Sequence, residues 1–246
     1  MNKFIVILTT IILIGNQTII AQTTTRNDTA SQRFALNSQK WILPVALISA
    51  GVIGTQLNLD SKVRDYRMAK KPNKIAIDDY TMFMPMASVF AFDLLGIKAK
   101  HSFRQRVLVS STSALLCFSI TTAGKYSIGR LRPDGSTYNS FPSGHTSAAF
   151  TGAELVWQEY KDQNFWIGIS GYAIATLTGA LRVYNNRHWC SDVMAGAGVG
   201  ILSTKIAYAL LPITSKLLFG TKGNNNIIAQ PIISSNVTGF GISLRL

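Results

Sequence analysis

The sequence predicts an all-α protein: a bundle of about five to six core helices that spans a membrane several times, with a short strand-like tail. Two observations come from composition. Hydrophobic residues make up 47% of the 246 residues and charged residues only 14%, whereas an ordinary soluble protein has roughly 25% charged residues. The third observation is a succession of apolar stretches along the chain. These cover residues 41–57, 80–97, 107–124, 146–157, 165–181 and 193–211.

The N-terminus has the features of a secretory signal peptide over residues 1–21. Lys3 precedes an apolar run, Phe4–Ile14, that is short for a membrane span. An uncleaved anchor is the alternative, and either segment would export the chain into or across a membrane. Residues 22–40 are rich in Thr, Ser, Asn and Gln, which is typical of an exposed polar linker before the membrane domain expected at 41–220.

Three of the apolar stretches are good candidates for membrane spans, because a span needs about 20 mostly apolar residues. They are 107–124, 165–181 and 193–211. The last two are rich in small residues, which let membrane helices approach closely. Glu154 lies in a shorter stretch, and we expect its carboxylate to face a partner or a cavity rather than lipid.

The stretch 80–97 is not predicted to span the membrane, since it contains Pro85 and Asp93 and has basic residues on both sides. Basic loops favour the cytoplasmic face of a membrane. We therefore expect this segment to lie at the cytoplasmic interface without crossing, with the loops near residues 70 and 100 on the same side.

The C-terminal tail, residues 221–246, changes character. After the turn-like sequence TKGNNN, apolar residues alternate at Phe240, Ile242, Leu244 and Leu246. A period of two is typical of a β-strand, so the tail is predicted to form a small hairpin or an edge strand.

The chain carries a net charge of +13, which favours an anionic partner such as an anionic lipid or substrate. Nucleic acid is disfavoured, because no Lys/Arg-rich block with interleaved aromatic residues occurs. The two cysteines, Cys117 and Cys190, are too few for a disulfide framework. No CxxC or HExxH pattern occurs, so neither a metal nor another cofactor is predicted.

Three polar patches fall at the ends of apolar segments. They are KYSIGRLRP at 125–133, PSGH at 142–145 and RVYNNRHWCSD at 182–192. Successive membrane helices run in alternate directions, so the C-terminal ends of two helices and the N-terminal ends of two others meet on one face. All three patches are therefore predicted to converge there.

The patches contain the groups that an anion site requires. Lys125, Arg132 and Arg182 supply positive charge, and arginine offers a planar fork that suits phosphate oxygens. A helix beginning near Ser143 presents free backbone N–H groups to an anion. Gly144 lets the backbone approach that anion closely.

His188 and Asp192 are four residues apart and would share one side of a helix. A carboxylate on one imidazole nitrogen raises the basicity of the other, so His188 can act as a nucleophile and His145 as the acid for a leaving alkoxide. Each residue alone also has a structural interpretation, as a cap, turn or snorkelling charge. The chain has only three histidines, and two lie in these patches. Arg130 and Arg187 could contact the ligand or support the site.

The spacing K-x6-R-P (Lys125, Arg132), P-S-G-H (142–145) and R-x5-H-x3-D (Arg182, His188, Asp192) resembles the type 2 phosphatidic acid phosphatase (PAP2) family. That family shares its site with vanadium haloperoxidases and bacterial nonspecific acid phosphatases. The resemblance in layout covers roughly residues 41–212. One position departs from the family pattern: Leu181 replaces a serine that usually precedes the arginine, and the resemblance implies the loss of one hydrogen bond to phosphate.

The resemblance implies a role for each site residue. His188 attacks phosphorus and forms a phosphohistidine, Asp192 orients His188, and His145 protonates the leaving oxygen and then activates water. The residues implied in holding the phosphate and stabilising its transition state are Lys125, Arg132, Ser143, Gly144 and Arg182. The family needs no metal.

These expectations combine into a membrane-embedded lipid phosphatase of the bacterial inner membrane, multi-pass, with its site facing the periplasm. Candidate substrates are lipid A phosphates, undecaprenyl pyrophosphate, phosphatidylglycerophosphate and phosphatidic acid. The alternatives are a phosphotransferase, a vanadate-dependent haloperoxidase, or a non-catalytic protein that binds anionic lipid. The sequence predicts neither the headgroup nor the oligomeric state.

Overall fold

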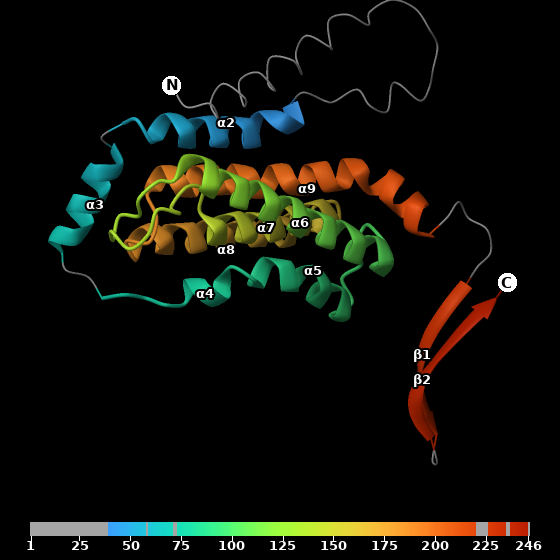
Figure 1. Ribbon diagram of the computed structural model, residues 1–246. Helices are drawn as coiled ribbons and strands as arrows, with labels where there is room; N and C mark the ends of the chain where they lie inside the picture. Colours follow the sequence, from blue (N-terminus) through green and yellow to red (C-terminus); the bar gives the residue numbers. More distant parts are fainter. Residues whose placement is uncertain (1–38, 58, 71–72, 220–225, 235–236, 246) are drawn as a thin grey trace, which may run out of the picture.

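The computed structural model describes residues 39–57, 59–70, 73–219, 226–234 and 237–245, so the expected signal peptide and nearly all of the polar linker lie outside the described residues. The described chain forms a helical bundle (Figure 1), which confirms the all-α prediction. Its helices are α2 (Gln39–Gly54), α3 (Leu59–Ala69), α4 (Asp78–Thr81), α5 (Met84–Leu94), α6 (Phe103–Ile128), α7 (Gly144–Tyr160), α8 (Phe165–Tyr184) and α9 (Cys190–Phe219).

Helix α7 is the centre of the bundle and packs against α5, α6, α8 and α9. Close approach depends on glycine. A Cβ at Gly152 would lie 2.4 Å from the backbone nitrogen of Met86 in α5, and one at Gly200 would lie 2.4 Å from the carbonyl oxygen of Ser147. Neither position has room for a side chain, which agrees with the predicted use of small residues at helix contacts.

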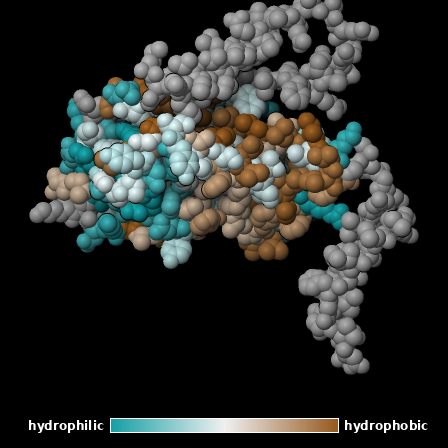
Figure 2. All heavy atoms as spheres, in the orientation of Figure 1, coloured by the Kyte–Doolittle hydropathy of each residue, from teal (hydrophilic) through white to brown (hydrophobic). Residues whose placement is uncertain are grey.

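Two of the described helices, α6 and α9, are long and apolar enough to cross a membrane. The sequence also proposed residues 165–181, but the corresponding helix α8 does not meet that standard. Leu115 and Phe118 on α6 are 67% and 70% exposed, as expected of side chains that face lipid. Figure 2 shows polar residues gathered at the end of the bundle where α3 lies, with a broad apolar zone beyond it.

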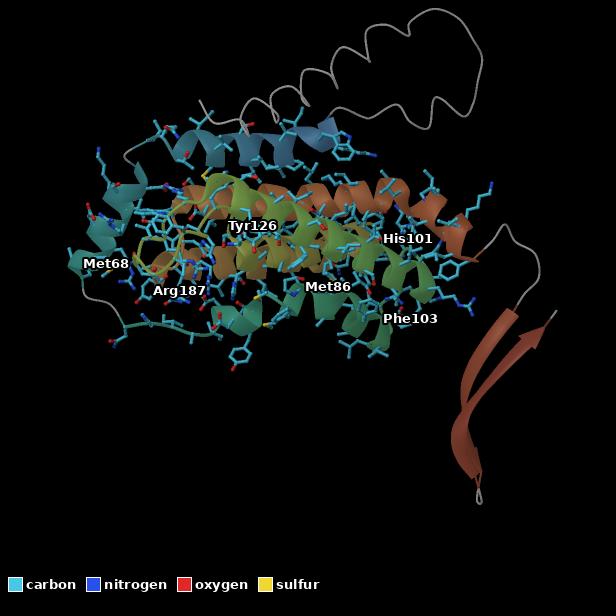
Figure 3. The ribbon with its side chains drawn as sticks, in the orientation of Figure 1. Met68, Met86, His101, Phe103, Tyr126 and Arg187 are labelled. Atoms are coloured by element: carbon cyan, nitrogen blue, oxygen red, sulfur yellow. The ribbon has the colours of Figure 1, made fainter. Side chains whose placement is uncertain are left out.

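Residues 80–97 do not lie at one end of the bundle, and the prediction that the loops near residues 70 and 100 share one side is wrong. Ile75 N donates to Asn185 Oδ1 at the C-terminal end of α8 (2.9 Å), whereas Lys100 N donates to the Glu159 carbonyl at the C-terminal end of α7 (3.1 Å). Helices α4 and α5 therefore cover the length of the bundle in two short pieces, and Figure 3 places Met68 and His101 at opposite ends. Because basic residues flank both ends, the charge pattern could not distinguish them.

Buried charges on α7 are paired, as the sequence predicted for Glu154. That residue is 1% exposed, and Lys205 Nζ lies 2.9 Å from its Oε1. One turn further along, Glu159 accepts hydrogen bonds from Tyr208 and from the backbone of His101. Both carboxylates lie toward the end of the bundle opposite α3 and stabilise its packing.

The tail contains the predicted strands. Strand β1 (Asn226–Ser234) pairs antiparallel with β2 (Val237–Arg245), with Asn226 opposite Arg245 and Ser234 opposite Val237. This hairpin follows α9 in the chain, after the helical bundle is complete.

Candidate active site

The three polar patches meet at the end of the bundle where α3 lies. A Cβ at Gly124, near the end of α6, would lie 2.7 Å from Pro142 Cδ, just before α7. Ser143 N donates to the carbonyl oxygen of Asp192 in the first turn of α9 (3.0 Å). The C-terminal end of α6 and the N-terminal ends of α7 and α9 are thus joined directly, in the arrangement that the alternation of helix directions predicted.

His188 and Asp192 form a buried pair. Helix α9 begins at Cys190, and Trp189 N donates to Asp192 Oδ2 (2.9 Å), which fixes this carboxylate at the helix N-terminus. The same oxygen lies 3.6 Å from His188 Nδ1, an ion-pair distance that is longer than a hydrogen bond. His188 is 2% exposed and Asp192 is fully buried.

The environment keeps His188 neutral. Burial is the largest cause and, with Lys125 and Arg182 nearby, lowers the pKa of His188 to about 4, against the opposing influence of Asp192. Since an imidazole must be unprotonated to act as a nucleophile, the arrangement favours the reactive form at neutral pH.

Asp192 accepts hydrogen bonds from two side chains to which the sequence motifs gave no definite role. Its Oδ1 accepts from Arg130 Nη1 (2.7 Å), and its Oδ2 accepts from Ser140 Oγ. The sequence left Arg130 undecided between ligand contact and support, and the structure places it on Asp192. Arg187 pairs with Asp134 nearer the surface, at 3.3 Å.

His145 and Arg182 share a carboxylate. His145 Nε2 lies 2.9 Å from Asp79 Oδ1, and Arg182 Nη1 lies 3.2 Å from the same atom and 2.5 Å from Asp78 Oδ2. The sequence motifs gave no role to the adjacent Asp78 and Asp79. In a chain with 11 acidic residues and a basic site, two adjacent aspartates could have been recognised as partners for its cations.

The N-terminus of α7 is the part of the site where the sequence predicts an anion cradle. Ser143 is the N-cap residue and is fully buried, but its side chain makes no capping bond; its Oγ accepts instead from Thr146 Oγ1 (2.9 Å). A Cβ at Gly144 would lie 3.9 Å from Lys125 Cε, so the lysine stem runs beside the glycine. The cradle therefore combines open backbone with a cation from α6.

Arg132 and Lys125 are connected through one residue. Lys125 Nζ donates to the carbonyl oxygen of Asn139, and Arg132 Nε donates to the side-chain Oδ1 of Asn139 (2.9 Å). Asn139 therefore orders both cations at the mouth of the site. Within the described ranges, no group of three or more His, Cys, Asp and Glu side chains is arranged to hold a metal ion.

An apolar cavity of about 330 Å³ opens beside the cradle. It reaches Gly144 at one end and runs between α5, α6 and α7. Its lining comprises Met82, Phe83, Met86, Ala114, Cys117, Phe118, Thr121, Gly144, Ala148 and Thr151. The cavity has the character expected for a hydrocarbon ligand, and it lies next to groups suited to an anion.

The helices of the bundle surround a cationic site that contains the His188–Asp192 pair. Residues 106–215 match the PAP2 superfamily, so this part of the chain is a PAP2 domain and the family resemblance is confirmed. A lipid A 1-phosphatase of Porphyromonas gingivalis is 37% identical over 174 residues, which cover 70% of this chain. The chain spans 38% of that relative's length.

Two solved structures are also similar. The crystal structure of Aquifex aeolicus LpxE has a TM-score of 0.44 and 21% identity, covering 58% of this chain and 92% of that one. The transmembrane PAP2-type phosphatidylglycerolphosphate phosphatase of Bacillus subtilis has a TM-score of 0.46 and 21% identity, covering 69% of this chain and 96% of the other.

Proposed function

We propose that this chain is a membrane phosphatase that hydrolyses phosphate esters of envelope lipids through a phosphohistidine. The single observation that carries the proposal is the buried His188–Asp192 pair, placed where the C-terminal end of α6 meets the N-terminal end of α7. A phosphate bound at that point would contact cations and open helix N–H groups on one side and the imidazole on the other.

In the first half of the proposed reaction, His188 Nε2 attacks phosphorus while Asp192 holds Nδ1 on the far side of the ring. The bond from phosphorus to the ester oxygen breaks, and His145 donates a proton to the departing oxygen. Lys125, Arg132 and Arg182 stabilise the negative charge on the equatorial oxygens.

In the second half, His145 takes a proton from a water molecule, which attacks phosphorus and breaks the bond to His188. Inorganic phosphate leaves and both histidines return to their starting states. His145 gives the proton in the first half and regains one from water in the second, so the proposed reaction requires no metal.

A lipid substrate is supported by the apolar cavity beside Gly144. A hydrocarbon chain lying between α5, α6 and α7 would bring its phosphate to the N-terminus of α7, and burying that chain would supply binding free energy. The relative named a lipid A 1-phosphatase favours a lipid A phosphate. Undecaprenyl pyrophosphate, phosphatidylglycerophosphate and phosphatidic acid are the other candidates.

We place the protein in the inner membrane with its site facing the periplasm. This proposal relies on the export-type N-terminus of the sequence and on the two helices able to span a membrane. A phosphotransferase would use the same phosphohistidine with an alcohol in place of water, and product analysis distinguishes the two reactions.

The test is phosphate release from a panel of these four lipid phosphates, with EDTA present, by the full chain in detergent micelles. We expect release by the wild type and by His101→Gln, whose histidine contacts Glu159 at the opposite end of the bundle, and none by His188→Ala. Unchanged release by His188→Ala would refute the assignment. Lipid binding without release in any form would favour the non-catalytic alternative.

A further inference from the structure

We propose that Asp60 and Arg130 are positioning residues of the phosphatase site, which hold Asp192 in the orientation that His188 requires. This inference rests on the proposed function. It adds to the site a carboxylate from α3, a helix that lies outside the residues 106–215 matched to the family.

Arg130 joins the two carboxylates through different nitrogens. Its Nη1 lies 2.7 Å from Asp192 Oδ1, and its Nη2 lies 2.7 Å from Asp60 Oδ2. The planar guanidinium fixes the angle between these two bonds. Because Asp192 is fully buried and Asp60 is 5% exposed, water does not compete for either carboxylate as it would at the surface.

Asp60 also contacts the residue that precedes Asp192. Its Oδ1 accepts from Ser191 N (3.1 Å), its Oδ2 accepts from Ser191 Oγ, and Arg130 Nη1 donates to Ser191 Oγ (2.6 Å). The carboxylate of Asp60 therefore secures both the backbone of the first turn of α9 and the arginine that bonds Asp192.

The ring of Trp189 packs near the Arg130 guanidinium and restricts its movement. The Arg130 guanidinium carbon lies 5.1 Å from the centre of that ring, and Arg64 of α3 lies 5.3 Å from it. With Arg130 confined in this way, rotation of the Asp192 carboxylate would break its bond to Nη1. The consequence is that Oδ2 stays directed at His188 Nδ1.

The substitution Asp60→Asn tests the inference, with Asp65→Asn as the matched control. Both change a carboxylate on α3 to an amide, but among the described residues Asp65 pairs with Arg64 at the surface, where its side chain is 65% exposed. The assay is phosphate release from short-chain phosphatidic acid by the full chain in detergent micelles, with the unfolding temperature measured in parallel.

We expect Asp60→Asn to lower kcat roughly tenfold to a hundredfold, since small misplacement of a reacting group has effects of this size. KM and inhibition by inorganic phosphate should stay within about twofold of the wild type, because Asp60 is not part of the phosphate cradle. Asp65→Asn should leave kcat unchanged. Equal kcat values for the two variants would overturn the inference.

Combining Asp60→Asn with Asp192→Asn tests whether Asp60 affects kcat through Asp192. If Asp60 acts through Asp192, Asp60→Asn should lower kcat little further in the Asp192→Asn background. The same fold-loss in both backgrounds would mean that Asp60 acts independently, which also overturns the inference.

If Asp60→Asn does not fold, Asp60→Glu retains the charge on a longer side chain. It should keep the wild-type unfolding temperature and show an intermediate loss of kcat; full kcat would contradict the inference. A wild type without activity on any lipid phosphate would instead refute the proposed function, and this inference with it.

Discussion

His145 is bonded through Nε2 to Oδ1 of Asp79, at 2.9 Å. The same carboxylate oxygen lies 3.2 Å from Arg182 Nη1, and the Asp79 side chain is 61% exposed. This exposed carboxylate thus accepts hydrogen bonds from both the proposed general acid and a proposed phosphate ligand. A phosphate approaching these donors must displace Asp79 or tolerate its charge.

Replacing Asp79 should therefore strengthen phosphate binding. We expect Asp79→Asn to lower KM and the inhibition constant for inorganic phosphate severalfold, because the variant removes a like charge beside the anion. Steady-state kinetics with added phosphate measures both constants. Asp78→Asn is the contrasting variant: Asp78 is 2% exposed and bonds Arg182 and Asn185, so its loss should lower the unfolding temperature. A higher KM for Asp79→Asn would show that the carboxylate assists binding.

The depressed pKa of His188 predicts how stability and activity depend on pH. The pKa falls from 6.5 to about 4 on folding, so between these values the unfolded chain binds more protons than the folded protein. Acidification through this window should destabilise the fold by about 1.4 kcal/mol per pH unit at most. Thermal unfolding from pH 4.5 to 7 measures the slope, which His188→Gln should reduce.

The same pKa keeps the nucleophile neutral in mild acid. Loss of kcat/KM through protonation of His188 should begin only as the pH approaches 4, well below the range of an ordinary histidine. A pH–rate profile of the wild type tests this expectation. If activity instead fell with an apparent pKa near 6.5, the value of an ordinary histidine, the result would contradict the described environment of His188.

The cradle glycine can be tested apart from stability. At Gly144 an added Cβ would meet Thr121 Cγ2 at 3.8 Å and Lys125 Cε at 3.9 Å, which are ordinary contacts. Gly144→Ala should keep stability within about 0.5 kcal/mol but raise KM, since its methyl group would occupy the space that phosphate approaches.

Gly152→Ala provides the opposite case. Its Cβ would lie 2.4 Å from the backbone of α5, so we expect a loss of about 1–3 kcal/mol of stability from overpacking. Chemical denaturation of both variants measures the contrast. A Gly144→Ala variant with unchanged KM would show that the phosphate lies elsewhere.

The cavity predicts a dependence on lipid chain length. Ala148 lines the cavity on α7, and Ala148→Phe would fill part of it. KM should rise for a long-chain phosphatidic acid and change little for a short-chain one. Leu115→Phe on α6, a residue that is 67% exposed and outside the cavity lining, should affect neither. An equal effect on both lipids would mean that the chain binds outside the cavity.

Local spacing predicted the parts of the site that are close in sequence. Ser143 and Gly144 begin α7 as expected, and His188 and Asp192, four residues apart, do pair. The short separation along the chain brings the two side chains of the pair together, with His188 just before α9 and Asp192 in its first turn.

The partners that sequence reasoning missed are distant along the chain. Asp60 meets Arg130 across 70 residues, and Asp78 meets Arg182 across 104. Such pairings depend on how α3 and α4 pack on the bundle, which no local pattern specifies. The expectation for residues 80–97 was wrong for a related reason. Both ends of the bundle carry basic residues, so basic flanks do not show at which end a segment lies.

The central claim is that His188 forms a covalent bond with phosphorus, and mass spectrometry of the trapped enzyme tests it most directly. The full chain would be mixed with short-chain phosphatidic acid, quenched in alkali and digested. The account predicts one phosphate on the peptide that contains His188, absent in His188→Ala and retained in His101→Gln. Turnover without that phosphopeptide, or with phosphate on another residue, would contradict it.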